Sequence, residues 1–192
     1  MNTQLAEIAE IRTGYSFRGR LEPHLAGTVA VIQMKDIDRS NLLRTEAIAR
    51  ILAPKDFEKH LVHKGDLLFR CRGQSYSAAL VEYDLDHAIV ASPMMLIRPH
   101  GQLIEPAYLR WFLNQASTHN GLASIAAGTA VKIISKTALE KLDIPIPPIE
   151  RQRRIAALGE LAQQEAKLTA ELAELRQKLL EKTLMQEAHR EN

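Results

Sequence analysis

A proline-rich block followed by a long heptad repeat constrains the fold of this chain more than any other feature. The block Ile144-Pro145-Ile146-Pro147-Pro148 cannot lie inside a helix. Each proline lacks an N–H group and disfavours the helical conformation of the residue before it. Pro148 can begin the helix that follows, because N–H groups in a first helical turn need no partner within the helix. The sequence therefore predicts a globular head up to residue 147 and a separate helix from Pro148.

Leucines in this helix recur with the alternating spacing of three and four residues that is typical of a coiled coil. They are Leu158, Leu161, Leu168, Leu172, Leu175 and Leu179. Glu165 falls on an a position of the repeat and Lys182 on a d position, where polar residues can fix register or orientation. A helix to about His189 would be roughly 60 Å long. Much of the leucine seam would face water without a second helix, so we expect dimerisation; the alternative is a helix that folds back on its own head.

Composition is that of a globular protein, because 46% of the residues are hydrophobic. The net charge is only +2, so a nucleic-acid-binding surface would need local clusters of basic residues. The single cysteine, Cys71, excludes an internal disulfide and a cysteine-based zinc site. No apolar run reaches about 18 residues and no signal-peptide pattern is present, which predicts a soluble cytoplasmic protein without membrane contact.

The head is predicted to be α+β, with many short strands and a few helices. Apolar, β-branched runs predict strands at 28–33, 67–69, 78–83, 88–91, 94–98 and 144–146. Helical segments are expected from Pro54, from Pro106 and, with Ser135 as the N-cap, up to Leu142. The period of 42–52 fits either a strand or a helix. The small residues of 121–130 predict a loop.

The sequence offers little for catalysis. Pro147-Pro148 lies between isoleucines and lacks the polar residue with which an adenine methyltransferase holds its target base. The letters of a nuclease motif at 165–167 lie inside the heptads, and no Walker loop or HExxH is found. His60 and His63 are interpreted as a surface pair and not as a metal site. Cys71 lies between two arginines, which would make it either a reactive thiol or, more simply, a bystander in a basic loop.

Basic and polar residues in the predicted loops are the better candidates for function. Arginine can bond guanine O6 and N7 together, glutamine can read adenine, and lysines or hydroxyls hold phosphates. Ordinary solvated surface is the alternative for each of them. The residues we expect to contact DNA are Arg18, Arg20, Lys35, Arg39, Arg70, Arg72, Gln74, Tyr76 and Lys132.

Four motifs resemble, in this order and at this spacing, those of specificity (S) subunits of Type I restriction-modification systems. They are GYSF at 14–17, KGDLLF at 64–69, PAYL leading into WFL at 106–113, and the proline block with Gln152 and Ile155. The similarity covers nearly the whole chain. Arg151 departs from the pattern, because the family more often has an acidic residue before the glutamine. The chain also has one head and one helix where the usual member has two of each, so it resembles a half-subunit.

The resemblance implies a target recognition domain over 1–147 and a spacer and dimerisation helix over 148–192. Such a chain would not be an enzyme: it would read one half-site of double-stranded DNA, form an antiparallel homodimer and scaffold methylase (M) subunits. It would bind no cofactor or metal, since S-adenosylmethionine is expected on the partner methylase. A restriction (R) subunit is a further candidate partner.

Two other functions are open from the sequence. The chain could be a stand-alone DNA-binding regulator, or a coiled-coil adaptor whose head binds protein. Pairing with a different half-subunit is also open.

Overall fold

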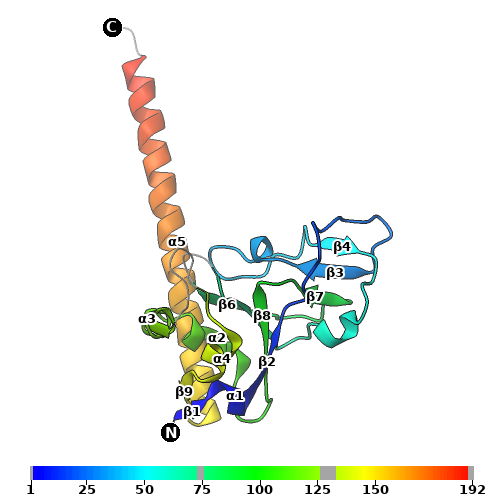
Figure 1. Ribbon diagram of the computed structural model, residues 1–192. Coiled ribbons are helices and arrows are strands. Elements are labelled where there is room, and N and C mark those ends of the chain that lie inside the picture. The colour runs from blue at the N-terminus through cyan, green and yellow to red at the C-terminus, as the bar shows by residue number, and fades with distance from the viewer. Residues whose placement is uncertain (1, 73–75, 126–132, 190–192) are drawn as a thin grey trace. The chain divides into compact units, whose positions relative to one another are not determined.

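The computed structural model describes residues 2–72, 76–125 and 133–189 and divides the chain into two compact units, Met1–Arg153 and Arg154–Asn192 (Figure 1). The first unit runs six residues beyond the predicted end of the head at 147, and we call it the head from here on. It holds the strands and short helices of the described residues. The second unit is most of one long helix. The predicted α+β fold class, with a long C-terminal helix, is confirmed.

The first sheet of the head is antiparallel. Its strands, in spatial order, are β2 (Ala9–Thr13), β8 (Met94–Pro99), β5 (Leu67–Arg70) and β6 (Ser77–Leu80). Ile97 in β8 pairs with Ile11 on one side and with Leu67 on the other. Leu67, Leu68 and Phe69 are fully buried, as a short, continuous apolar run predicts. The strands expected at 67–69, 78–83 and 94–98 are thus found, although the second already ends at Leu80.

The second sheet is mixed and packs on the first. It consists of β4 (Ala49–Ile51), β3 (Val29–Ile32) and β7 (Ala88–Val90), with β3 antiparallel to β4 and parallel to β7. Ala30 and Ile32 of β3 belong to a buried cluster with Leu68 and Leu96 of the first sheet. Val29 and Val31 point to the opposite face, as strand alternation requires. The region 42–52, which fitted either a strand or a helix, ends in β4.

Short helices and one two-stranded ribbon complete the head. They are α1 (Leu5–Ile8), α2 (Pro106–Leu113), α3 (Ala116–Ile125), α4 (Lys136–Glu140), the 3₁₀ turns η1 (Met34–Asp36) and η2 (Phe57–His60), and the antiparallel pair β1 (Asn2–Gln4) and β9 (Asp143–Pro145). Ser135 caps α4 as predicted, because its hydroxyl accepts a hydrogen bond from Ala138 N at 3.1 Å. The prediction of a loop over 121–130 is wrong for 121–125, because these residues belong to α3. Burial of Leu122 and a bond from Thr118 Oγ1 to Phe112 O hold this helix despite its small residues.

The long helix α5 (Ile149–Ala188) begins inside the head, directly after the proline block. Gln152 in its first turn is 1% exposed, and its amide makes three hydrogen bonds. Oε1 accepts from Glu105 N at 2.8 Å, and Nε2 donates to Leu103 O at 3.1 Å and to Pro147 O at 2.8 Å. A buried amide must satisfy its donors and acceptor. Gln152 therefore joins the proline block to the segment before α2, which explains its place in the motif.

The apolar seam of α5 is exposed. Its six leucines range from 48% exposed at Leu172 to 67% at Leu158. A contiguous apolar stripe of this length is typical of an interaction surface. The helix thus has the unpartnered face on which the expectation of dimerisation depends, and the dimer itself stays a prediction. Among the described residues, no helix combines the length and the low charge needed to cross a membrane.

Candidate nucleic-acid interface

The segment that carries Arg18 and Arg20 begins with a close backbone contact at Gly14. A Cβ atom at this position would lie 2.6 Å from the carbonyl carbon of Ala91, so only glycine fits without movement of the backbone. Gly14 N donates to Met94 O at 2.9 Å and Tyr15 N donates to Val90 O at 2.7 Å. Ser92 N returns a bond to Tyr15 O at 2.9 Å. The GYSF motif therefore fixes the path of the chain from β2 toward the second sheet.

Two hollows flank the segment after Gly14. The first, of about 520 Å³, is lined by Ser16, Phe17, Gly19, Leu21, Gln33, Met34, Lys35, Ala91, Ser92 and Pro93. The second, of about 700 Å³, is lined by Thr13, Gly14, Tyr15, Ser16, Phe17, Arg18, Pro54, Lys55, Asp56 and His60. Phe17 borders both, and its ring packs 4.8 Å from that of Tyr15. Arg18 and Lys35, which are 17 positions apart in the sequence, thus lie in the walls of neighbouring hollows.

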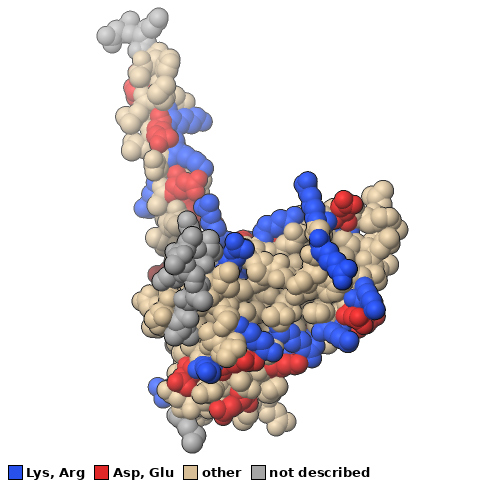
Figure 2. Space-filling view, viewed as in Figure 1, with Lys and Arg blue, Asp and Glu red and all other residues tan. Residues whose placement is uncertain are grey.

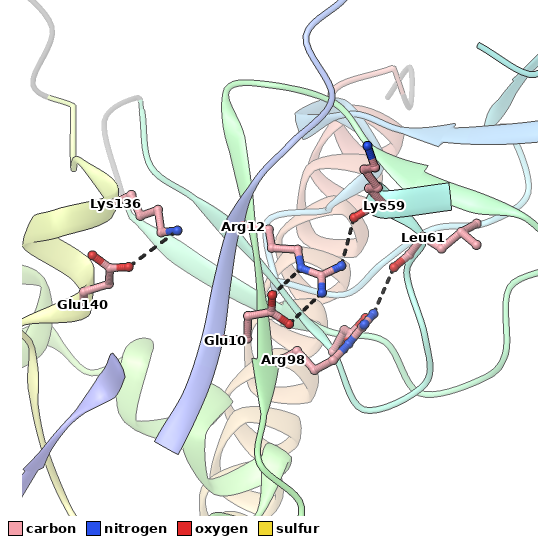
Figure 3. A network of polar contacts seen from close by, with 8 residues as sticks. Glu10, Arg12, Lys59, Leu61, Arg98, Lys136 and Glu140 are labelled. Atoms are coloured by element: carbon pink, nitrogen blue, oxygen red, sulfur yellow. Dashed lines mark hydrogen bonds and ion pairs between the residues drawn. The ribbon is translucent and has the colours of Figure 1, made fainter. Parts of the chain in front are cut away.

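Arginines of the first sheet hold the far wall of the second hollow (Figure 3). Arg12 Nη1 donates to Lys59 O at 2.9 Å, and Arg98 Nη2 donates to Leu61 O at 2.9 Å. Glu10 orients Arg12 through two bonds of 2.7 and 2.8 Å, and this pairing holds the pKa of Glu10 below its ordinary value. The segment around η2 is therefore fixed to β2 and β8, and the hollow has a rigid frame.

The turn that carries Lys35 is held from within. The carboxylate of Asp36, which is 7% exposed, accepts a bond from Gln33 N at 2.8 Å and so closes η1. Lys35 itself is exposed, beside the first hollow. Arg18 and Arg20 are exposed as well. The structure therefore brings three of the predicted DNA contacts to one region: Arg18 and Lys35 line neighbouring hollows, and Arg20 lies two residues after Arg18.

The guanidinium of Arg70 is half-buried and hydrogen-bonds to a loop of the head. Its Nη2 donates to Asn41 Oδ1 at 2.6 Å and to Asp38 O at 3.3 Å, and its Nε donates to Ser77 Oγ at 2.7 Å. These bonds fasten the loop 38–41, which carries the exposed Arg39, to the end of β5. The interpretation of Arg70 as a base-reading residue does not fit this arrangement, because most of its donors are already bonded. Arg70 instead holds the loop that carries Arg39, and so positions Arg39.

Asp38 braces the same loop from the other side. Its Oδ1 accepts bonds from Ser40 N at 2.8 Å and Leu42 N at 2.9 Å, and Arg44 Nη2 lies 2.6 Å from Oδ2. Burial raises the pKa of Asp38, but the bonds from Leu42 and Arg44 outweigh it and keep the pKa below its ordinary value. The loop is thus built around an ionised carboxylate.

Replacement of Arg70 by alanine should lower stability. It removes several hydrogen bonds of a half-buried guanidinium, each worth about 1 kcal/mol, and leaves the Asn41 side chain without its donor. We expect a loss of about 2–3 kcal/mol and a Tm lower by roughly 4–12 °C, measured by differential scanning calorimetry. Arg72→Ala is the control, because Arg72 is exposed and should leave Tm unchanged. A wild-type Tm for Arg70→Ala would restore the base-reading interpretation.

The remaining residues predicted to contact DNA differ in their exposure. Arg72 is exposed two residues after the end of β5, where its backbone forms an isolated bridge with Ile133. Tyr76 is only 6% exposed, so the expectation that it contacts DNA is not supported: its ring belongs to the core. Gln74 and Lys132 lie outside the described residues.

The thiol of Cys71 is not built for reactivity. It is 3% exposed and hydrogen-bonds to Pro93 O. Burial raises its pKa, against a smaller opposing effect of Arg72. The bystander interpretation therefore fits better than a reactive thiol. Among the described residues, no three His, Cys, Asp or Glu side chains gather in a way that could hold a metal ion.

Sequence reasoning missed residues that act through the fold. Lys55 lines the second hollow, and its carbonyl accepts a 3.3 Å bond from Tyr15 Oη. Asn41 has a left-handed backbone with φ of 58° and accepts the bond from Arg70. Asparagine tolerates the left-handed conformation, so the sequence could have indicated a turn at Asn41. Nothing in the sequence placed Lys55 beside Arg18.

Basic side chains gather on the face of the head that holds β3 and β4, with acidic ones among them (Figure 2). The chain as a whole carries a net charge of only +2. Local clustering of arginine and lysine is therefore the feature that could attract a phosphate backbone. Of the residues predicted to contact DNA, Arg18, Arg20, Lys35, Arg39 and Arg72 are exposed.

Three comparisons relate this arrangement to known proteins. The family model of the Type I restriction modification DNA specificity domain matches residues 1–173. A putative type I restriction enzyme MjaX specificity subunit from Methanocaldococcus jannaschii is 30% identical over 108 residues, which are 54% of this chain and 25% of that protein.

Two solved structures share the fold. The HsdS subunit from Thermoanaerobacter tengcongensis matches with a TM-score of 0.65 and 24% identity, over 95% of this chain and 44% of that one. The S subunit of a Type-I restriction-modification system from M. genitalium matches with a TM-score of 0.57 and 14% identity, over 95% and 44%. This chain thus spans a quarter of the curated relative and less than half of each solved structure. The match of the family model over most of the sequence confirms the resemblance seen in the four motifs: the chain belongs to the type I restriction-modification DNA specificity domain family.

Proposed function

We propose that the head reads one half-site of a double-stranded DNA target. The observation that carries this function is a set of exposed cations on loops that a rigid scaffold holds: Arg18, Arg20, Lys35, Arg39 and Arg72. Arginine pairs with guanine in the major groove, and lysine binds phosphates. Hydrogen bonds of Asp36 and Arg70 fix the turns of Lys35 and Arg39 before binding, and those of Gly14 and Tyr15 fix the start of the segment that carries Arg18 and Arg20. The family supports the same role, since its model describes a DNA specificity domain.

Helix α5 pairs two copies of the chain in this proposal. Its exposed leucines need a partner of the same length and spacing, and a second copy provides one. A twofold dimer presents two identical heads, so its target is an inverted repeat of two half-sites.

The chain supplies recognition and scaffolding, and its partners supply the chemistry. Methylase subunits carry S-adenosylmethionine and modify adenines at the site that the heads select. A restriction subunit joins the same assembly where one is encoded. These partners act on DNA in the cytoplasm, and this chain acts with them.

The test is to express the full chain with a type I methylase subunit from the same genome, purify the complex and map the methylated adenines. We expect co-purification, and methylation confined to an inverted repeat. Methylation at asymmetric sites alone would contradict the homodimer and leave the DNA-reading head intact. Failure of the methylase to co-purify would favour the stand-alone regulator if the chain binds DNA, and the adaptor if it does not.

A further inference from the structure

The two charged residues of the leucine seam differ from four other charged residues of α5, which form ion pairs within the helix. Lys167 pairs with Glu171 at 3.8 Å, and Lys178 pairs with Glu174 at 2.5 Å, each within one helical turn. Glu165 has no basic residue three or four positions away in the helix, where leucine, alanine and threonine stand instead. Lys182 has no acidic residue three or four positions away. In the described part of the chain, no ion pair involves either of them. Both are exposed on the apolar face, where a charge without a partner opposes association.

We propose that α5 pairs antiparallel with α5 of a second copy in a single register, in which Glu165 faces the partner's Lys182. This deepens the homodimer of the proposed function and rests on it. In antiparallel coiled coils an a residue of one helix meets a d residue of the other, and Glu165 and Lys182 occupy an a and a d position. The twofold axis then passes between Ala173 and Glu174, so the ion pair forms twice, once at each end of the seam.

The same register pairs the four central leucines of the seam with one another and sets Leu158 and Leu161, which lie beyond the ion pairs, against the partner's His189 and the partner's Gln186, respectively. It sets Leu168 against the partner's Leu179, and Leu172 against the partner's Leu175. By symmetry these contacts also form twice, which places an uninterrupted leucine core between the two ion pairs. Beside the seam, Glu171 faces the partner's Lys178, which adds an attractive contact between opposite charges.

Other arrangements bring like charges together. Sliding one helix by a heptad in one direction sets Glu171 against the partner's Glu171, and sliding it in the other sets Lys178 against the partner's Lys178. Both shifts also separate Glu165 from Lys182. A parallel dimer sets each of these two seam charges against its own copy. Buried ion pairs add little net stability but strongly penalise a mismatch, so they select the register and exclude helices without the matching charges.

Charge exchange in the full-length chain tests this register. Glu165→Lys or Lys182→Glu alone should produce like-charge contacts at both ends of the dimer and raise its dissociation constant at least about 100-fold. The double variant Glu165→Lys/Lys182→Glu re-forms both pairs with their signs exchanged. We expect it to recover the wild-type constant to within about tenfold. Dissociation constants are measured by analytical ultracentrifugation without DNA or methylase. Glu181→Lys makes the same charge change on the outer face of the helix and should have little effect.

The outcomes separate this inference from the function on which it rests. Loss of association in both single variants and its recovery in the double variant would support the register. A dimer that tolerates the single changes, or a double variant that stays dissociated, would overturn the register while the homodimer stands. A wild-type chain that stays monomeric would overturn the register and the homodimer together, and the binding of DNA by the head is measured independently of this result.

Discussion

Leu172→Glu should convert the dimer into a monomer. Leu172 is the least exposed of the six seam leucines, and it lies beside the proposed twofold axis, facing the partner's Leu175. The substitution removes two leucine contacts per dimer and sets two carboxylates without partners in the middle of the core. Each unpaired buried charge costs several kcal/mol in practice, and each lost leucine adds about 2 kcal/mol. We expect the dimer dissociation constant to rise by a factor of about 1,000 or more, measured by sedimentation equilibrium.

Ala170→Glu provides the matched control for this change. It introduces the same carboxylate two residues away, on the outer face of the helix, and should leave the dimer intact. The Tm of the head should be the same in both variants. A dimeric Leu172→Glu chain would show that the leucine seam is not the interface, whatever the register.

The extended elements could be predicted because local pattern and tertiary environment agree. Leu67, Leu68 and Phe69 form an uninterrupted apolar run, and both faces of β5 are buried. The long helix α5 could be predicted because its leucines follow a heptad repeat and the proline block before it fixes where the helix begins. The prediction of a loop over 121–130 failed at its start. Small residues are typical of a loop, but the burial of Leu122 keeps the chain helical up to Ile125. Packing outweighed propensity there.

The motifs that identify the family hold the scaffold together. Gly14 allows the backbone contact with Ala91, and Gln152 satisfies three groups of the head with one buried amide. Asp66 of the KGDLLF motif is 1% exposed and accepts bonds of 2.8 and 2.7 Å from Arg98. The exposed cations lie on the loops between these motifs. The sequence could therefore indicate the family more securely than the residues that contact DNA.

The candidate site could be predicted only in part for a physical reason. Arg70 and Arg72 look alike in the sequence, but Arg70 bonds to a loop some 30 residues away and Arg72 does not. Side-chain direction at the end of a strand depends on such distant partners. The proximity of Lys35 to the segment of Arg18 depends in the same way on the contact between two sheets.

Removal of Arg18 and Lys35, which line the two hollows, together with the neighbouring Arg20 should abolish most DNA binding without loss of stability. The variant Arg18→Ala/Arg20→Ala/Lys35→Ala deletes three exposed charges for which the structure gives no ion pair among the described residues. On a mixed-sequence duplex, which lacks the target bases, all three cations contact phosphates. Each phosphate contact contributes about 0.9 to the slope of log K against log salt concentration, so the slope should fall by roughly 2.7 per head. At about 0.1 M salt the affinity for a mixed-sequence duplex should fall about 10²- to 10³-fold. Fluorescence anisotropy over a range of KCl concentrations measures both quantities.

Three other exposed lysines give a control of equal charge. Lys64→Ala/Lys136→Ala/Lys141→Ala lowers the net charge by the same amount, and none of these residues lines either hollow. We expect this control to keep most of its salt slope and affinity, because the proposed interface is local. Equal losses in the two triple variants would mean that only net charge matters, and the surface around Arg18 and Lys35 would then not be the reading face. A loss confined to the first variant, at unchanged Tm, would assign the contact with DNA to these loops.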